Sequence, residues 1–230
     1  MLRVKIKQSI ACFQIPEIGN PILSYPLVPP STVFGLLRYI CNYAPINYEN
    51  TRIAISGHYE SKIRHILRYH ITGMSDKGKY KTNIIPTEEL YNVEHIIHID
   101  SNRDYEDMIK NNIHRSTRLG RKEDLISSIE CSEVRPLELS TDDLDYTNVN
   151  TQDYIYIPFE RYRDIDALSI FRISLDSDKP SLDNGSLKMH YLRILFLKTQ
   201  NYLNKMEKVL SSQDEQGNYY IYEWLNDIKT

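Results

Sequence analysis

The sequence predicts an α+β protein in which a ferredoxin-like β-α-β-β-α-β unit with a long central hairpin is followed by a smaller, mostly β region. Three observations support this. Apolar and polar residues alternate in 2–7, 52–72 and 91–100, as they do in half-buried strands. Apolar residues recur with helical spacing in 32–43 and in a segment that ends near Asn112. A segment rich in glycine and lysine, 72–83, separates two of the strands. We expect the first unit to span 1–140 and the second region 141–230.

The N-terminal strand, 2–7, places Arg3, Lys5 and Lys7 on one face, which we expect to be a cationic outer face. Residues 15–31 follow with five prolines, which fix φ and oppose helix, so an extended surface loop is expected. Ser31 is a good N-cap for the helix over 32–43. Gly35 inside that helix costs roughly 1 kcal/mol relative to Ala, which suggests that another group packs closely there.

A hairpin over about 62–99 is the longest feature that the pattern predicts. Its first strand has Lys62, Arg64, Arg68 and His70 on one face, and its tip, 72–83, is expected to be mobile because it has no apolar period. Three lysines lie in this tip: Lys77, Lys79 and Lys81. After the return strand, one of the residues 100–102 should cap the second helix.

The C-terminal region begins after a polar stretch, 140–152, that is expected to be a linker. Three strand-like segments, "DYIYIPF", "LSIFRISL" and "HYLRILFL", follow it. The segment "NYLNKMEKVL" is expected to form a helix, and "GNYYIYEWL" a closing strand. This region is therefore expected to be mostly β.

Composition restricts the possible classes of protein. The three cysteines, Cys12, Cys41 and Cys131, are far apart and form no CxxC pair, so neither a disulfide framework nor a zinc site is indicated. No stretch has the length or hydropathy of a membrane span, and the N-terminus does not resemble a signal peptide. The expectation is a cytoplasmic protein with no membrane partner.

Charge is unevenly distributed in the 230 residues, whose formal net charge is −3. Residues 52–81 contain seven Lys or Arg and two Asp or Glu, whereas 130–183 contain thirteen acidic and five basic residues. This asymmetry favours a basic functional face in the first half, although chance clustering is the alternative.

The stretch "HRSTRLGRKED", 114–124, concentrates positive charge around one glycine. Such a cluster is either well solvated or placed to bind an anion. The acids that follow are typical of the first turn of a helix, and a basic loop before a helix start would form a phosphate site. The residues of this candidate site are Arg115, Arg118, Gly120, Arg121 and Lys122, followed by Glu123 and Asp124.

These features together favour binding of single-stranded RNA, for which ferredoxin-like sheets are a common platform. Tyrosines could stack on bases, and Tyr25 is the only one of the eighteen that we single out. No motif for nucleotide hydrolysis or metal-dependent cleavage is present, so no cofactor, metal or enzymatic activity is expected. Metal-free RNA cleavage needs a base, for which the candidates are His58, His65, His70 and His114. His95 and His98 make a weaker candidate for a metal pair.

Two motifs resemble a known family. The opening "IKQSIACFQIPEIGNPILSYPLVPPSTVFGLLRYI" and the later "LGRKED" are similar to the fifth Cas family, the RAMP-type subunit of type I CRISPR surveillance complexes (Cascade), and closest to subtype I-B. The resemblance covers roughly 1–140. Pro30-Ser31 and Leu119-Gly120-Arg121 match the motifs of the family, whereas the hairpin lysines match by position only.

This resemblance implies a RAMP fold and a non-catalytic subunit that grips the repeat-derived 5′ handle of the guide RNA and caps the Cascade backbone in antiviral defence. The hairpin would be the thumb of the family. The implied partners are the guide RNA, a neighbouring backbone subunit and the large subunit, with target DNA near the flanking motif as a further candidate. The candidate RNA-binding residues are Arg115, Arg118, Gly120, Arg121, Lys122, Arg64, Arg68, Lys77, Lys79, Lys81, Tyr25, Pro30 and Ser31.

Two alternative functions remain open on the sequence. One is a metal-independent endoribonuclease that processes precursor guide RNA, and the other is a protein-interaction scaffold. For the LGR motif, the alternative is a turn that closes the sheet and leaves its arginines in solvent.

Overall fold

Antiparallel strands form the main sheet of the computed structural model, which describes residues 1–16, 20–74, 80–144, 146–149, 153–177 and 189–226. The spatial order is β4-β1-β3-β2-β6-β8-β7. The first four strands have the ferredoxin-like order, so the predicted α+β fold is confirmed. The strands are β1 (Leu2–Ala11), β2 (Arg52–Met74), β3 (Tyr80–Asp100), β4 (Ile126–Glu133), β6 (Tyr154–Pro158), β7 (Ser169–Ser177) and β8 (Met189–Lys198).

The C-terminal strands extend this same sheet. β6 pairs with β2 only at Ser56 and Gly57, and β8 and β7 follow outward. The three expected strand segments are therefore present, joined to the first unit through hydrogen bonds. Division of the chain at residue 140 stays a prediction, and β5 (Leu137–Ser140), just before it, pairs with β9 (Lys208–Gln213).

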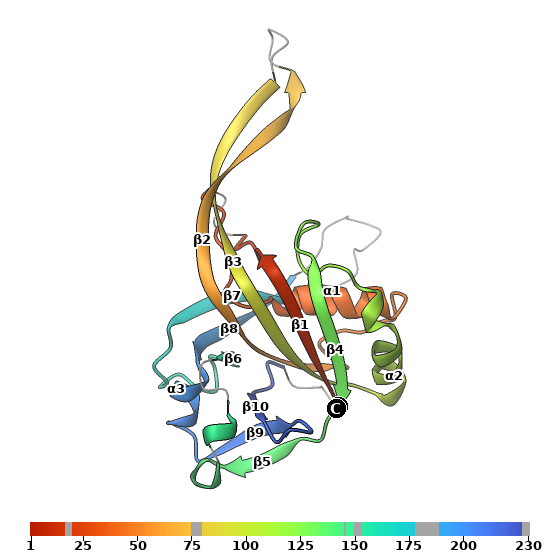
Figure 1. Ribbon diagram of the computed structural model, residues 1–230, viewed down its shortest axis with the longest axis vertical. Helices are drawn as coiled ribbons and strands as arrows, with labels where there is room; N and C mark the ends of the chain where they lie inside the picture. The colour runs from red at the N-terminus through yellow and green to blue at the C-terminus, as the bar shows by residue number, and fades with distance from the viewer. Residues whose placement is uncertain (17–19, 75–79, 145, 150–152, 178–188, 227–230) are drawn as a thin grey trace.

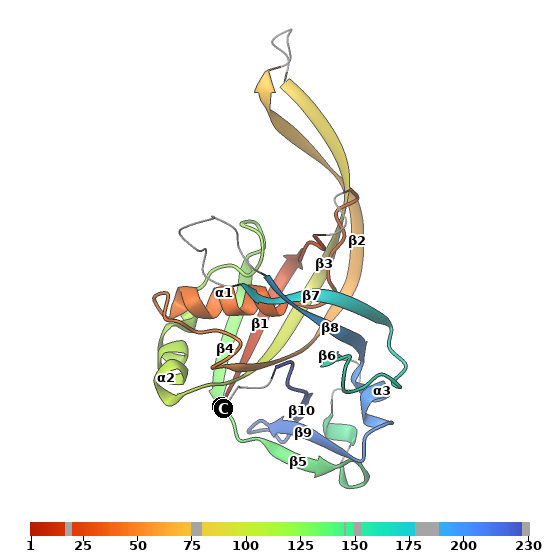
Figure 2. The same ribbon diagram turned by 180° about the vertical axis from the view of Figure 1, so that it is seen from behind.

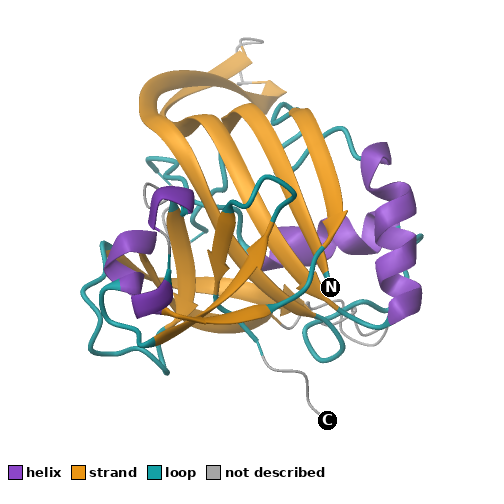
Figure 3. Cartoon of the chain, turned by 60° about the horizontal axis from the view of Figure 1, so that its bottom comes forward, coloured by secondary structure: helices purple, strands orange, loops and turns teal. Residues whose placement is uncertain are grey.

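A smaller sheet of order β10-β9-β5 lies across one face of the main sheet (Figure 3). Its strand β10 spans Tyr219–Tyr222. The smaller sheet covers the face that we expected to be cationic. Arg3 is buried and donates to Ser212 Oγ, and both Arg3 and Lys5 lie over the ring of Tyr220. The expectation of an exposed cationic face along β1 is wrong at these two positions, because the later sheet uses them for stacking.

Two helices, α1 (Pro30–Ile40) and α2 (Arg103–Asn112), lie together on the opposite side of the sheet (Figures 1 and 2). Asn102 caps α2 by accepting from the backbone N–H of Tyr105, as expected. The first helix differs from expectation, because its N-cap is Pro29 and not Ser31, and it ends at Ile40. Pro30 occupies the first helical position, where its missing N–H is not needed.

The remaining short helices correct two expectations. The segment 201–210 is not one helix, because α3 (Thr199–Leu203) ends and β9 starts at Lys208. The polar stretch 140–152 is more than a linker in the part that the structure describes, since Leu144 and Val149 are buried in a second hydrophobic core. The 3-10 helices are η1 (Ile113–Arg115), η2 (Thr141–Asp143) and η3 (Tyr146–Asn148).

The hairpin of β2 and β3 projects beyond the body of the molecule (Figure 1). Its strands are longer than expected, reaching Met74 and resuming at Tyr80, so the described ends of the segment 72–83, which was expected to be a mobile tip, belong to strands. Lys77 and Lys79 lie outside the described residues. The proline-rich loop braces the hairpin base, because Ile22 N–H donates to Pro86 O and Ile22 O accepts from Glu88 N–H, both at 2.9 Å.

No helix among the described residues has the length and hydropathy to cross a membrane.

Candidate nucleic-acid interface

The stretch 116–125, which we call the glycine loop, is organised by the buried carboxylate of Asp124. This carboxylate accepts from the backbone N–H groups of Cys12 at 3.2 Å and Arg121 at 2.9 Å. Gln8, on β1, donates to the carbonyls of Leu119 and Asp124, both at 2.9 Å. The loop is thus fastened to the end of β1. The expected helix after it is wrong: Asp124 is a loop acceptor, and β4 begins at Ile126.

Gly120 is required by this loop for two reasons. Its φ is +104°, a conformation that side chains disfavour. A Cβ there would lie 2.8 Å from Asp124 Oδ2 and 3.2 Å from Phe13 Cε1. The sequence suggested that this glycine lets backbone amides approach a phosphate, and the structure supplies an intramolecular reason for it.

Arg121 has its charge compensated within the chain. Its guanidinium contacts Asp124 at 2.8 Å, Glu89 at 2.6 Å and Glu123 at 3.7 Å. Burial alone would lower the pKa of Arg121, but hydrogen bonds to Asp124 and Glu89 outweigh it and raise that pKa. Because Glu89 belongs to β3, this arginine also ties the glycine loop to the hairpin base. A phosphate would have to compete with these carboxylates.

The other basic residues of the glycine loop and the turn before it are free of such partners. Arg115, Arg118 and Lys122 are exposed and form no ion pair with any described residue. Arg115 donates only to the Asn112 side chain, at 3.3 Å. These three cations therefore offer uncompensated positive charge beside the loop.

A groove of about 380 Å³ runs between α1 and the glycine loop. Gly35 forms part of its floor, and a Cβ added there would meet nothing within 4 Å. The expected close packing at Gly35 is therefore wrong, because this glycine opens space. The remaining lining residues are Thr32, Leu36, Tyr39 and the run from Ser116 to Gly120.

A second groove, of about 300 Å³, adjoins the first at Thr32 and Gly120. It brings together Tyr25, Ser31, Gly120 and Arg121, which the sequence singled out separately. The ring of Tyr25 is a wall of this groove, since it is only 3% exposed and packs edge-on against a phenylalanine of β7. Ser31 Oγ hydrogen-bonds to Ser174 Oγ at 2.6 Å, and Pro30 is buried.

The candidate cations of the hairpin lie apart from these grooves. Lys62 and Arg64 contact Glu88 at 3.1 and 3.4 Å, while Arg68 is exposed and forms no ion pair with a described residue. The side chain of Lys81 is outside the described part of the molecule, although its backbone pairs with Ile71.

Groups suited to catalysis are scarce in the described part of the chain. His95 and His98 are fully buried, and burial lowers the pKa of each to about 3, so both are neutral. Burial also raises the pKa of the Cys12 thiol, in the second groove, to about 11. His65 Nδ1 lies 3.6 Å from Glu89. The described residues contain no group of His, Cys, Asp and Glu that could hold a metal ion.

The fold and the site define a class of protein: a ferredoxin-like sheet with a projecting hairpin and a basic, glycine-containing loop beside its first helix. The chain belongs to the CRISPR-associated protein (Cas_Cas5) family, whose model matches residues 1–190. The family resemblance of the two sequence motifs is thus confirmed.

Solved structures with a similar fold include a chain described as "CRISPR RNA-guided surveillance complex", which is 9% identical with a TM-score of 0.50. The match covers 86% of this chain and 89% of that one. Another is the "Crystal structure of a CRISPR protein from Archaeoglobus fulgidus", 12% identical with a TM-score of 0.41, covering 97% of this chain and 99% of that one. The likeness to the surveillance-complex chain, at 9% identity, shows the fold alone. No curated protein matches the chain.

Proposed function

We propose that this chain is a non-catalytic RNA-binding subunit of a type I CRISPR surveillance complex. In this role it grips the repeat-derived 5′ handle of the guide RNA and caps the backbone, in the cytoplasm, as part of antiviral defence. Family membership supports work in a CRISPR system, and the structural neighbour that is itself a surveillance-complex chain agrees with it. The sequence motifs favour subtype I-B.

One observation supports RNA binding above the others. Positive charge that is unpaired among the described residues lies beside the two adjoining grooves, on Arg115, Arg118 and Lys122. Residues of the two sequence motifs, among them Ser31 and Gly120, line these grooves. Exposed charges of one sign repel one another, so their clustering around a fixed loop is explained best by an anionic ligand. The grooves are open troughs between a helix and a loop, which suits a single strand more than a compact metabolite.

The partners in this proposal are those that the family resemblance implies. The 5′ handle would lie along the glycine loop, and the projecting hairpin would act as the thumb that meets the neighbouring backbone subunit and the guide RNA. The large subunit and the target DNA near the flanking motif are the further partners that we propose.

The proposal is tested by the RNA that copurifies with the chain. We expect guide RNA with one fixed 5′ end, and no cleavage of labelled repeat RNA by the purified protein in EDTA. Products with a 2′,3′-cyclic phosphate that disappear in His65→Ala or His114→Ala would favour the endoribonuclease instead. Absence of copurifying RNA, with normal assembly of the complex, would favour a protein-interaction scaffold.

A further inference from the structure

Two arginines lie directly opposite each other on the outermost described strands of the main sheet. Arg172 of β7 pairs in register with Arg193 of β8, so both side chains project from the same face. Both are exposed. Like charges that face each other across a strand pair are destabilising, and a sheet that keeps them needs compensation from elsewhere.

Aromatic rings hold these arginines flat against the sheet. The guanidinium carbon of Arg172 lies 4.1 Å from the ring centroid of Tyr191, and that of Arg193 lies 4.8 Å from the centroid of Phe159. The guanidinium carbon of Arg163 also lies over the Phe159 ring, at 5.8 Å from its centroid. A guanidinium that lies over a ring keeps the N–H donors of its edge available for hydrogen bonds. Arg193 uses two of these groups, Nε and one Nη, to donate to Glu160.

Carboxylates neutralise only part of this charge. Glu160 accepts from Arg193 and Arg163, so one acid serves two bases. Arg172 forms no ion pair with any described residue. The three arginines and one glutamate therefore leave a surplus of positive charge on a region whose overall composition is acidic.

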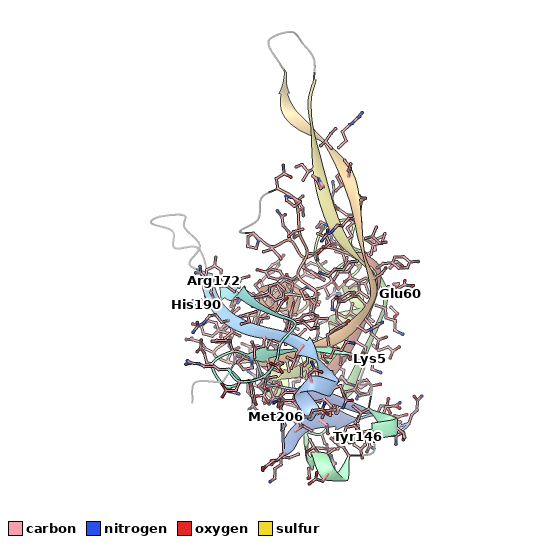
Figure 4. The ribbon with its side chains drawn as sticks, turned by 90° about the vertical axis from the view of Figure 1, so that its left-hand side faces the viewer. Lys5, Glu60, Tyr146, Arg172, His190 and Met206 are labelled. Carbon is pink, nitrogen blue, oxygen red and sulfur yellow. The ribbon has the colours of Figure 1, made fainter. Side chains whose placement is uncertain are left out.

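Apolar surface adjoins the arginines. Ile170 is 58% exposed, Leu168 53% and Tyr191 44%, so a half-open ring and two aliphatic side chains lie beside the stacked guanidinium groups. Figure 4 shows Arg172 near His190 at the outer margin of the body, on the opposite side from Glu60 of the hairpin. The face is thus separate from the hairpin.

This face is continuous with the grooves of the candidate interface. Ser174, two residues after Arg172, lines the second groove and pairs across the sheet with Tyr191. The hydroxyl of Tyr25, a wall of that groove, donates to the carbonyl of Arg172 at 3.1 Å. A single-stranded nucleic acid that leaves the second groove along β7 would therefore reach these arginines next.

We propose that this face, formed by Phe159, Arg163, Ile170, Arg172, Tyr191 and Arg193, is a second binding surface for single-stranded nucleic acid. The guanidinium edge of Arg172 would bind one phosphate, and Arg193 would bind another through the N–H groups that do not donate to Glu160. The exposed ring of Tyr191 and the side chain of Ile170 would contact a base and its sugar. An acidic protein segment would satisfy the charge but would leave the half-open aromatic ring unexplained. The proposal rests on the proposed function in one respect, since the strand is taken to continue from the grooves.

The test measures binding of a uridine oligomer and a thymidine oligomer, each of about twelve nucleotides, as a function of salt concentration. Replacing Arg172 and Arg193 together by Ala should flatten the log-log slope by about 1.4, since each phosphate contact on a single strand contributes roughly 0.7. Tyr191→Ala should weaken binding roughly tenfold through lost stacking. The RNA and DNA arms tell which strand the face prefers.

The matched control removes two paired surface cations elsewhere, Arg103→Ala with Lys208→Ala, and should leave the slope unchanged. Arg172→Gln with Arg193→Gln keeps side-chain stems on the rings and repeats the test if the alanine variant unfolds.

Failure of this proposal and failure of the proposed function give different results. An unchanged slope in both arginine variants, with binding still lost in Arg115→Ala with Arg118→Ala, would overturn the second surface and leave the first intact. Loss of complex assembly with unaltered oligomer binding would show that the face docks an acidic protein, which also overturns the proposal. A flattened slope in the Arg172 and Arg193 variants alone would support this face and count against the grooves.

Discussion

The glycine loop and the hairpin each combine paired and unpaired basic residues, but the paired arginine of the loop is largely buried, whereas the paired cations of the hairpin are more exposed. In the loop, Arg121 is paired with Asp124 and Glu89. Arg115, Arg118 and Lys122 form no ion pair with a described residue. On the hairpin, Lys62 and Arg64 share the buried carboxylate of Glu88, and Arg64 itself is 80% exposed. The buried Asp124 carboxylate therefore fixes the loop and the Arg121 side chain, whereas the described ion pairs of Lys62 and Arg64 involve more exposed cations and contribute less to stability. Basic clusters that look alike in sequence differ in what they stabilise.

The largest effect is expected at the centre of the loop. Asp124→Ala removes the acceptor for two backbone N–H groups and leaves the Arg121 guanidinium with fewer partners. Loss of the buried carboxylate leaves the backbone N–H groups of Cys12 and Arg121 without their acceptor and the Arg121 charge with only Glu89 and Glu123, so the free energy of unfolding should fall by about 3 kcal/mol. Urea unfolding measures it.

Glu123→Ala is the matched control, because Glu123 is exposed and lies 3.7 Å from the same arginine. It should change stability by less than about 0.5 kcal/mol. Equal losses in the two variants would mean that Asp124 does not organise the loop, and the contrast with the hairpin would disappear.

The contrast between loop and hairpin was only partly visible in the sequence. Alternation and helical spacing predicted the strands of the main sheet, both main helices and the hairpin, because these patterns are local, whereas the start of β9 was expected to be helical. The partner of Arg121 on β3, Glu89, is 32 residues away in sequence, and no local pattern reports such a contact. The acidic pair after the basic stretch resembled a helix start, since loop acceptors and first-turn acids use the same residue types.

The arginine face was hidden for a related reason. Counting charges over 130–183 gives an acidic region, but a sum over sequence does not show which side chains share a face. Only the register of β7 with β8 places Arg172 opposite Arg193. The grooves are hidden in the same way. Whether Gly35 lines a groove together with the glycine loop depends on how α1 packs. In the sequence, a glycine inside a helix looks the same whether it opens space or permits close contact.

The second prediction separates free cations from the compensated one. Arg115→Ala with Arg118→Ala should flatten the salt dependence of binding to repeat RNA by about 1.4 in log-log slope, with the melting temperature unchanged. Arg121→Ala should do the reverse: its main effect should be a loss of stability, because its carboxylate partners are left behind. If Arg121→Ala instead flattens the slope without destabilising the protein, Arg121 is a phosphate ligand, as its sequence position suggested.

The smallest effect on stability is expected on the hairpin, and it would sharpen the contrast most. Arg64→Ala with Arg68→Ala removes one weakly paired and one unpaired surface cation, so unfolding free energy should change by less than about 0.5 kcal/mol. The same double variant should lower the yield of complex on co-expression with guide RNA and the neighbouring subunit. Exposed charges on the projecting hairpin are screened by solvent in the free protein, and they contribute to the free energy of binding only when a partner covers them. Arg103→Ala on α2, an exposed arginine paired with the exposed acid Asp107, controls for loss of positive charge in general. Unfolding of the double variant would place the hairpin charges in the folding energetics, whereas an unchanged yield of complex would show that they remain solvated and that the loop alone holds the RNA.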